Sequence, residues 1–327
     1  MNAIERRALY NLLRMNWLND PSLSVESWQV EEYRPLSLMT LFHRLKPYDI
    51  QLDRVSFVAY ADECDSPEDF TDHLTADRNF STAQEDQIYL IVFELWRRLM
   101  SEKPSLSIIC NELDHQIHLY DEGQVEDLSI LQNALTRFIQ ILDENADEGV
   151  PPQHVLRLIS TYCANDIETF LYDFISEQID EENETYVREL LDDFDIYLAN
   201  NKWFKLLHIR LCDEYHNKIS QQLIEEVMEE HLNDHDLDYN LEFLSILGEK
   251  GFDPLFKTIV QQTLPLIKKE EDFLDLLAIS IDYVHRLDQE AQEQTIKAIL
   301  DKHESFPPEK PIQPDHPDLA ALVDLLT

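Results

Sequence analysis

Glycine is nearly missing from this chain: four glycines occur in 327 residues, against about 7% in average proteins. Glycine is the residue that most readily adopts a positive φ, so it supplies hairpin turns, strand bulges and phosphate-binding loops. The sequence also has no Gly-x-Ser-x-Gly motif and no glycine-rich phosphate loop. These absences argue against hairpin-rich sheets, P-loop proteins and dinucleotide-binding folds.

Long apolar runs and clustered cysteines are missing as well. No stretch approaches 18 uninterrupted apolar residues, so we expect no membrane-spanning helix. The first seven residues carry charge before any apolar run, which is unlike a secretory signal peptide. The cysteines are widely spaced in apolar helical patterns, which favours reduced core thiols over a disulfide or zinc framework. They are Cys64, Cys110, Cys163 and Cys212. We therefore expect a cytoplasmic protein that binds no membrane.

Positive charge is scarce, because 26 Lys and Arg face 66 Asp and Glu, for a net charge of −40 and a pI near 4.4. The imbalance is uneven along the chain: residues 1–50 are neutral, whereas residues 101–200 hold 23 acids and 4 basic residues. Such a field repels nucleic acid and anionic membranes and attracts basic proteins. The alternative is that the acidity serves only solubility.

Apolar residues recur near i, i+3, i+4 and i+7 through most of the chain, which is the pattern of amphipathic helices. Residues 66–69 have the features of a helix start, with a serine cap, a proline and two acids. Residues 82–85 fit a capping box before a strongly apolar helix that continues to about Leu99. We predict an all-α protein whose N-terminal helical domain covers residues 1–150.

From residue 152 the helical pattern becomes periodic. Helix pairs are predicted to start near residues 152, 184, 220 and 254, with one further helix from about 289. The second helices share an apolar block whose isoleucines recur 34, 37 and 33 residues apart. These isoleucines are Ile175, Ile209, Ile246 and Ile279. A period in this range is typical of α-solenoids built from helix–turn–helix units.

Residues 152–303 therefore resemble the HEAT and tetratricopeptide class of helical repeats in period and pattern. They lack the Trp-Leu-Gly-Tyr signature of tetratricopeptide repeats and have few small residues, so HEAT-like or irregular repeats fit better. The resemblance implies antiparallel helix pairs stacked as an α-solenoid-like array over residues 151–305. An ordinary bundle of helices about 14 residues long with short loops would give a similar period.

Residues 306–327 form a proline-rich connector followed by a short amphipathic helix. The apolar residues of this predicted docking helix are Leu319, Leu322, Val323, Leu325 and Leu326. A tethered helix with one apolar face can bind a groove on a partner. It can also fold back and cover the last repeat of its own array, which solenoid ends require.

Residues 165–173 are similar to the second magnesium motif of class I terpene synthases. That resemblance implies that Asn165, Thr169 and Asp173 lie on one helix face and bind a hard cation. The sequence departs from the motif in its last residue, which is Asp rather than Glu, and the partner aspartate-rich motif is missing. The alternative is that Asn165 caps a helix whose first turn carries Asp166 and Glu168.

Two further features of the sequence bear on metal binding and catalysis. Residues 231–238 combine histidines and aspartates between two predicted helices, and a solvated polar turn is favoured over a metal site. The sequence offers no Cys–His arrangement for nucleophilic catalysis, although such a pair can form in space. We therefore predict neither a catalytic site nor a cofactor.

These observations predict a non-enzymatic adaptor, scaffold or chaperone that presents an acidic surface to a basic protein partner. The acidic residues proposed to bind the partner are Asp166, Glu168, Asp173, Glu177, Asp192, Asp193 and Asp195. One alternative is an acidic nucleic-acid mimic that inhibits a DNA-binding protein. The other is a magnesium-dependent all-α enzyme that uses residues 165–173.

Overall fold

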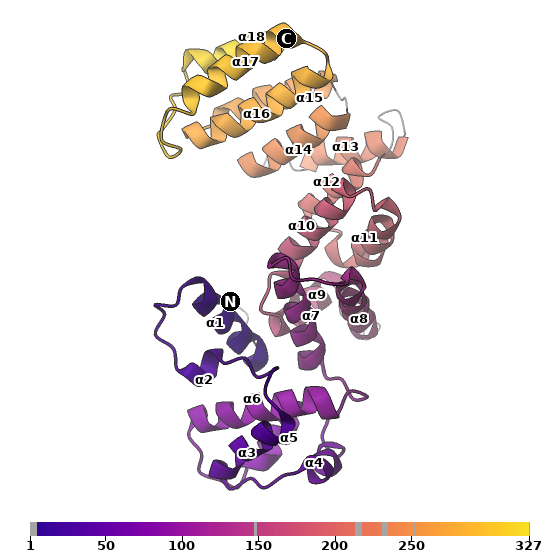
Figure 1. The fold of residues 1–327 in the computed structure, drawn as a ribbon. Helices are drawn as coiled ribbons and strands as arrows, with labels where there is room; N and C mark the ends of the chain where they lie inside the picture. The colour runs from indigo at the N-terminus through magenta and orange to yellow at the C-terminus, as the bar shows by residue number, and fades with distance from the viewer. Residues whose placement is uncertain (1–4, 147–148, 213–217, 231–234, 251–252, 327) are drawn as a thin grey trace. The chain divides into compact units, whose positions relative to one another are not determined.

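The computed structural model describes residues 5–146, 149–212, 218–230, 235–250 and 253–326. Figure 1 shows that this part of the chain is built from helices, as predicted, and it contains no β-strand beyond an isolated bridge between Lys269 and Pro311. None of its helices combines the length and apolar character that crossing a membrane requires. The all-α prediction is confirmed.

The helices follow one another with short connections. The first nine are α1 (Arg6–Asn19), α2 (Ser27–Val30), α3 (Leu38–Leu45), α4 (Arg54–Ala61), α5 (Pro67–Thr75), α6 (Thr82–Leu99), α7 (Leu106–Asp121), α8 (Leu128–Ala146) and α9 (Pro152–Ile159). The next nine are α10 (Ile167–Asp180), α11 (Glu184–Leu198), α12 (Lys202–Arg210), α13 (Lys218–Glu230), α14 (Leu237–Lys250), α15 (Asp253–Thr263), α16 (Glu270–Arg286), α17 (Glu290–His303) and α18 (Pro317–Leu326). The described part of the chain also contains the 3₁₀ turns η1 (Lys46–Tyr48), η2 (Ser160–Tyr162) and η4 (Leu264–Leu266).

The chain forms two compact units. The first comprises Met1–Leu171 and Asp193–Tyr197, and the second comprises Tyr172–Asp192 and Leu198–Thr327. This division differs from the predicted domains 1–150, 151–305 and 306–327, because it assigns residues 151–171 to the first unit. Compactness does not show which segments fold independently, so those domain boundaries stay a prediction.

Helix starts are set by local capping. Ser66 accepts a hydrogen bond from the backbone N–H of Asp69 at 3.1 Å, with Pro67 in the first turn, as the sequence predicted. At α6 the capping box consists of Ser81 and Gln84, one residue earlier than predicted. Ser81 accepts from the Gln84 N–H, and the Gln84 side chain accepts from the Ser81 N–H.

The core of the first unit surrounds α6, which packs against α3, α4 and α5 (Figure 1). Every residue from Ile88 to Trp96 is buried, so this helix is covered on all sides. The Trp96 indole N–H donates to the Lys103 carbonyl at 3.0 Å, which satisfies its polar group inside the core. The cysteines Cys64, Cys110 and Cys163 are buried free thiols.

The second unit repeats one packing pattern. Helix α12 packs against α13 and α14, helix α14 against α15 and α16, and α16 against α17. In stacked helix pairs, each helix contacts the helix that follows it and also the helix after that one. The predicted starts near 220, 254 and 289 agree with α13, α15 and α17 to within two residues. Ile209 and Ile246 are buried and Ile279 is partly buried in the same core.

Candidate functional site

The predicted acidic residues are all exposed. Four of them lie in the first unit: Asp166, Glu168, Asp193 and Asp195. Three lie in the second unit: Asp173, Glu177 and Asp192. Exposure is what a partner-binding carboxylate requires. Because the two groups belong to separate units, their combination into one binding surface stays a prediction.

The start of α10 differs from the prediction. Asp166, not Asn165, caps the helix, because its Oδ1 accepts from the Thr169 N–H at 3.2 Å. Asn165 lies before the helix, and its side-chain amide donates to Asp114 at 2.9 Å. The helix face that the magnesium motif requires therefore begins with a residue outside the helix that already binds another side chain. The enzyme alternative gains no support from this arrangement.

The polar turn before α14 lies partly outside the described residues, which exclude 231–234. Of the described part, His235 is exposed and has a positive φ of 56°. Asp236 accepts from the Tyr239 N–H at 3.2 Å and pairs with Lys202 at 2.6 Å. Asp236 thus caps α14 and holds it to α12.

The predicted docking helix is α18, and its apolar face is covered by its own chain. Leu319, Leu322 and Leu326 are buried in the core of the second unit, and Val323 and Leu325 are partly buried. Helix α18 packs against α15, α16 and α17. Its docking partner is therefore the end of the helical array, which is the second of the two predicted alternatives.

A buried carboxylate at the centre of the first unit was not predicted. Asp114 of α7 is 4% exposed and accepts hydrogen bonds from four donors. These are the N–H of Ala164 at 2.9 Å, the N–H and side-chain amide of Asn165 at 3.1 and 2.9 Å, and the Asn11 side-chain amide at 3.0 Å. Burial raises the pKa of Asp114, and these hydrogen bonds oppose the rise. Asp114 thus joins α7 to α1 and to the turn before α10.

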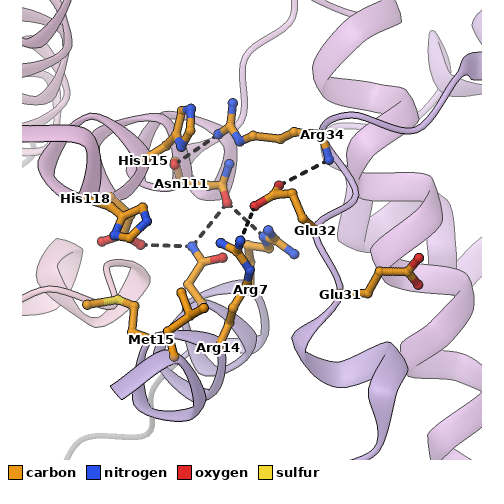
Figure 2. Close-up of a pocket in the computed structure, with 12 residues that line it drawn as sticks. Arg7, Arg14, Met15, Glu31, Glu32, Arg34, Asn111, His115 and His118 are labelled. Atoms are coloured by element: carbon orange, nitrogen blue, oxygen red, sulfur yellow. Dashed lines mark hydrogen bonds and ion pairs between the residues drawn. The ribbon is translucent and has the colours of Figure 1, made fainter. Parts of the chain in front are cut away.

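Figure 2 shows the pocket beside this carboxylate, where Arg7 and Asn111 face each other. The Arg7 Nε donates to Asn111 Oδ1 at 2.8 Å, and the Asn11 amide donates to the same oxygen at 3.1 Å. The Arg7 guanidinium also lies over the Phe93 ring, 4.9 Å from its centroid. Burial lowers the pKa of Arg7 below its ordinary value. Together these contacts fix the orientation of both asparagine amides.

Ion pairs form the outer wall of the pocket (Figure 2). Glu32 forms an ion pair with Arg14 at 2.8 Å, and its carboxylate accepts a hydrogen bond from the backbone N–H of Arg34 at 3.2 Å. Arg34 pairs in turn with Glu112 at 2.9 Å. Burial, assisted by the Arg34 charge, lowers the pKa of His115 from 6.5 to about 4. The cavity volume is about 50 Å³, room for only a few water molecules. The contacts around it join α1, α7 and the segment after α2.

The signal for this junction lies in the helix pattern of α7. Asp114 and Asn111 occupy the same face as the buried Cys110, Leu113 and Ile117, so they are polar residues at apolar positions. Such residues must find partners when they are buried. The partners themselves lie 50 to 104 residues away in sequence, and no local pattern identifies them.

A Cys–His contact that the sequence could not show lies beside α5. The Cys64 sulfur is 3.5 Å from His73 Nδ1, and Asp69 Oδ1 is 3.4 Å from the same nitrogen. Burial and the nearby Asp69 charge raise the pKa of the Cys64 thiol. A reactive thiolate is favoured by a lowered pKa, so the surroundings of Cys64 favour the neutral thiol.

The second unit has an acidic hollow between α14 and α16. Its volume is about 470 Å³. Its lining residues are Ser245, Gly248, Glu249, Ile279, Asp282 and Arg286. On the same two helices, burial and then the charges of Glu271, Asp272 and Asp238 raise the pKa of Asp275. Carboxylates thus repel one another near Asp275, while Arg286 in the lining and Arg210, 3.7 Å from Glu249, offset part of the negative charge of the hollow.

Comparison of the chain with protein-family models, with curated proteins and with solved structures found no match. What the molecule does is therefore inferred from its own residues.

Proposed function

We propose that this protein is a non-enzymatic cytoplasmic adaptor, scaffold or chaperone that binds a basic segment of a partner protein through its exposed carboxylates. The observation that carries the proposal is the charge imbalance. Even if each of the 26 Lys and Arg neutralised one acid, 40 carboxylates would have no cation from this chain. A partner rich in Lys and Arg would supply the missing charge.

The basic residues of the protein are largely engaged in ion pairs within the chain. Examples are Arg6–Asp86, Arg14–Glu32, Arg34–Glu112, Arg44–Glu31, Arg97–Glu94, Lys202–Asp236 and Lys310–Glu270. Arg97–Glu94 lies within α6, and the other pairs join separate segments of the chain. Because acids outnumber basic residues, such pairing leaves a surface rich in carboxylates. Such a surface raises the rate of encounter with a basic partner, and salt screens the effect.

Two places in the second unit are candidates for the binding surface. One consists of Asp173, Glu177 and Asp192 on α10 and α11, which the sequence predicted. The other is the α14/α16 hollow, where Glu249 and Asp282 stand beside the partly buried Ile279. The carboxylates would raise the rate at which the basic partner associates, and apolar contacts with residues such as Ile279 would slow its dissociation.

The test starts with capture of partners from native lysate on the tagged full-length protein, eluted by a salt gradient and identified by mass spectrometry. The affinity of the purified partner is then measured for three variants that each remove three negative charges. The first is Asp173→Asn/Glu177→Gln/Asp192→Asn, and the second is Glu249→Gln/Asp275→Asn/Asp282→Asn. The third is the matched control, Glu225→Gln/Glu290→Gln/Asp301→Asn.

We expect the first variant to weaken binding about tenfold, because three ion pairs of roughly 0.2–1 kcal/mol each are lost. It should also reduce the salt dependence of the affinity more than the control does. A loss confined to the second variant would place the site in the α14/α16 hollow. Equal, small effects of all three variants, or elution of no basic protein at low salt, would refute the proposal. Competition between this protein and DNA for the partner would instead identify a nucleic-acid mimic.

A further inference from the structure

The C-terminal end of the second unit contains a histidine buried between two carboxylates. His303, the last residue of α17, is 0% exposed. Its Nδ1 lies 2.5 Å from Glu270 Oε2, at the start of α16. Its Nε2 lies 2.9 Å from Asp318 Oδ2, in the first turn of α18. The rings of Phe273 and Phe306 wall the imidazole in, with centroids 4.9 and 5.8 Å away.

Both ring nitrogens of His303 therefore face carboxylate oxygens. A neutral imidazole has one N–H, so it can donate to only one of two carboxylates, and its second nitrogen would face an acceptor with a lone pair. A metal ion bound beside the pair, to both Nε2 and the Asp318 carboxylate, would use the lone pairs of both atoms. Such an ion needs at least one more ligand from the protein.

His316 supplies that ligand. It lies in the connector just before α18, and its Nδ1 is 3.8 Å from Asp318 Oδ2. The same Nδ1 accepts a long hydrogen bond of 3.3 Å from the Asp318 backbone N–H, which metal binding would replace. The ligand atoms of His303, His316 and Asp318 all lie within 4.8 Å of one another. In a tetrahedral zinc site with bonds of about 2.0–2.2 Å, neighbouring ligand atoms are roughly 3.4 Å apart. Asp318 Oδ2 lies 2.9 Å from His303 Nε2 and 3.8 Å from His316 Nδ1, so one distance is shorter and one is longer than that value.

Glu270 has the position of an orienting group. A metal-binding histidine usually donates its other N–H to a carboxylate, which fixes the tautomer and the direction of the ring. Glu270 accepts from His303 Nδ1 in this way and is itself held by Lys310 at 3.1 Å. This contact would leave Nε2, on the side of Asp318, to bind a metal ion.

We propose that His303, His316 and Asp318 form a zinc site, with Glu270 as the positioning residue. Two imidazoles and a carboxylate suit Zn²⁺ better than Mg²⁺ or Ca²⁺, which prefer oxygen ligands. His316 is 28% exposed, so solvent reaches the fourth coordination position. Lys302, which pairs with Asp318, is 52% exposed and can turn to solvent when the metal binds.

The metal would close the end of the second unit. Backbone hydrogen bonds from Glu270 to Lys310 and from Ile312 to Lys268, both 2.9 Å, already hold the connector against the start of α16. A zinc ion would add a bond network that joins α17, the connector and α18. A metal that binds the folded state and not the unfolded state raises the free energy of unfolding by mass action.

The experiment is zinc titration of the metal-free full-length protein by calorimetry, with thermal unfolding measured with and without zinc. We expect one tight site that raises the midpoint of thermal unfolding. His316→Gln should weaken zinc binding by about tenfold or more and abolish the thermal shift. Glu270→Gln should weaken binding less, because glutamine still offers an acceptor to Nδ1. Co²⁺ in the site should show the visible bands of four-coordinate cobalt.

His73→Gln is the matched control, because it removes a histidine from the Cys64–Asp69–His73 cluster of the first unit and should leave this zinc site intact. His316 is partly exposed, so circular dichroism should show that His316→Gln stays folded. The proposal is overturned if the wild type binds no zinc, or if His316→Gln binds zinc as tightly as the wild type. Detection by NMR of a doubly protonated His303 that zinc does not displace would also overturn it.

Discussion

The carboxylate of Asp114 organises the junction of the first unit, and Asp114→Asn tests it. All four of its partners are donors, and asparagine offers one acceptor oxygen and one N–H₂ group. If the oxygen stays with Ala164 and Asn165, the new amide faces the Asn11 amide, so two donors oppose each other at the 3.0 Å contact. The substitution thus replaces a charge-assisted hydrogen bond between Asn11 and Asp114 with a buried contact between two N–H donors.

Rotation of the neighbouring amides cannot relieve this contact. If Asn11 flipped its amide, its oxygen would face Asn111 Oδ1, which now accepts from it at 3.1 Å. If Asn111 flipped as well, its N–H₂ would face Arg7 Nε, and arginine has no acceptor. The orientation of the network is therefore fixed from Arg7 to Asp114.

The expected loss of stability is about 2–4 kcal/mol. A hydrogen bond to a charged group contributes roughly 1.5–3 kcal/mol, and an unsatisfied buried donor costs about 1–3 kcal/mol. Removal of a buried charge offsets part of this loss, since burial disfavours the ionised carboxylate. The assay is equilibrium unfolding of the full chain in urea.

The control is Asp77→Asn, an exposed aspartate in a turn, which should change stability by less than about 0.5 kcal/mol. The double variant Asn11→Ala/Asp114→Asn should lose less than the sum of its single variants, because alanine removes one of the opposed donors. If Asp114→Asn were as stable as the control, or if the two substitutions were additive, the fixed orientation of the network would be wrong.

Two further predictions concern buried groups in each unit. Asn240 is 1% exposed, and neither its Nδ2 nor its Oδ1 has a hydrogen-bond partner among the described residues. Asn240→Leu should therefore raise the unfolding free energy by about 1–2 kcal/mol, and a lower urea midpoint would contradict this. The pKa of His115 is lowered from 6.5 to about 4 in the folded protein, so the unfolded protein binds the proton more readily. The stability of the protein therefore falls as the pH drops from 6.5 toward 4. His115→Gln should reduce the loss of stability between pH 7 and pH 5 in urea unfolding, and an unchanged pH dependence would show that His115 is solvated.

The helices were predictable because their signals are local. The cap at Ser66 and the starts of α9, α11, α13 and α15 depend on residues within one or two turns, and the sequence located them to within two residues. The apolar face of α18 was also visible in the sequence. Two predicted caps were wrong by one residue, at Ser81 and at Asp166, where neighbouring residues compete for the same cap.

Composition and helical periodicity thus determined by themselves an acidic all-α chain with repeated helix pairs. Only the tertiary structure decided that Asp114 collects donors from α1 and from the turn before α10, that His303 lies between Glu270 and Asp318, and that α18 covers its own array. The physical reason is separation along the chain: these partners lie 15 to 103 residues apart. Amphipathic patterns show that a face will be buried, but the partner of that face depends on how the helices pack.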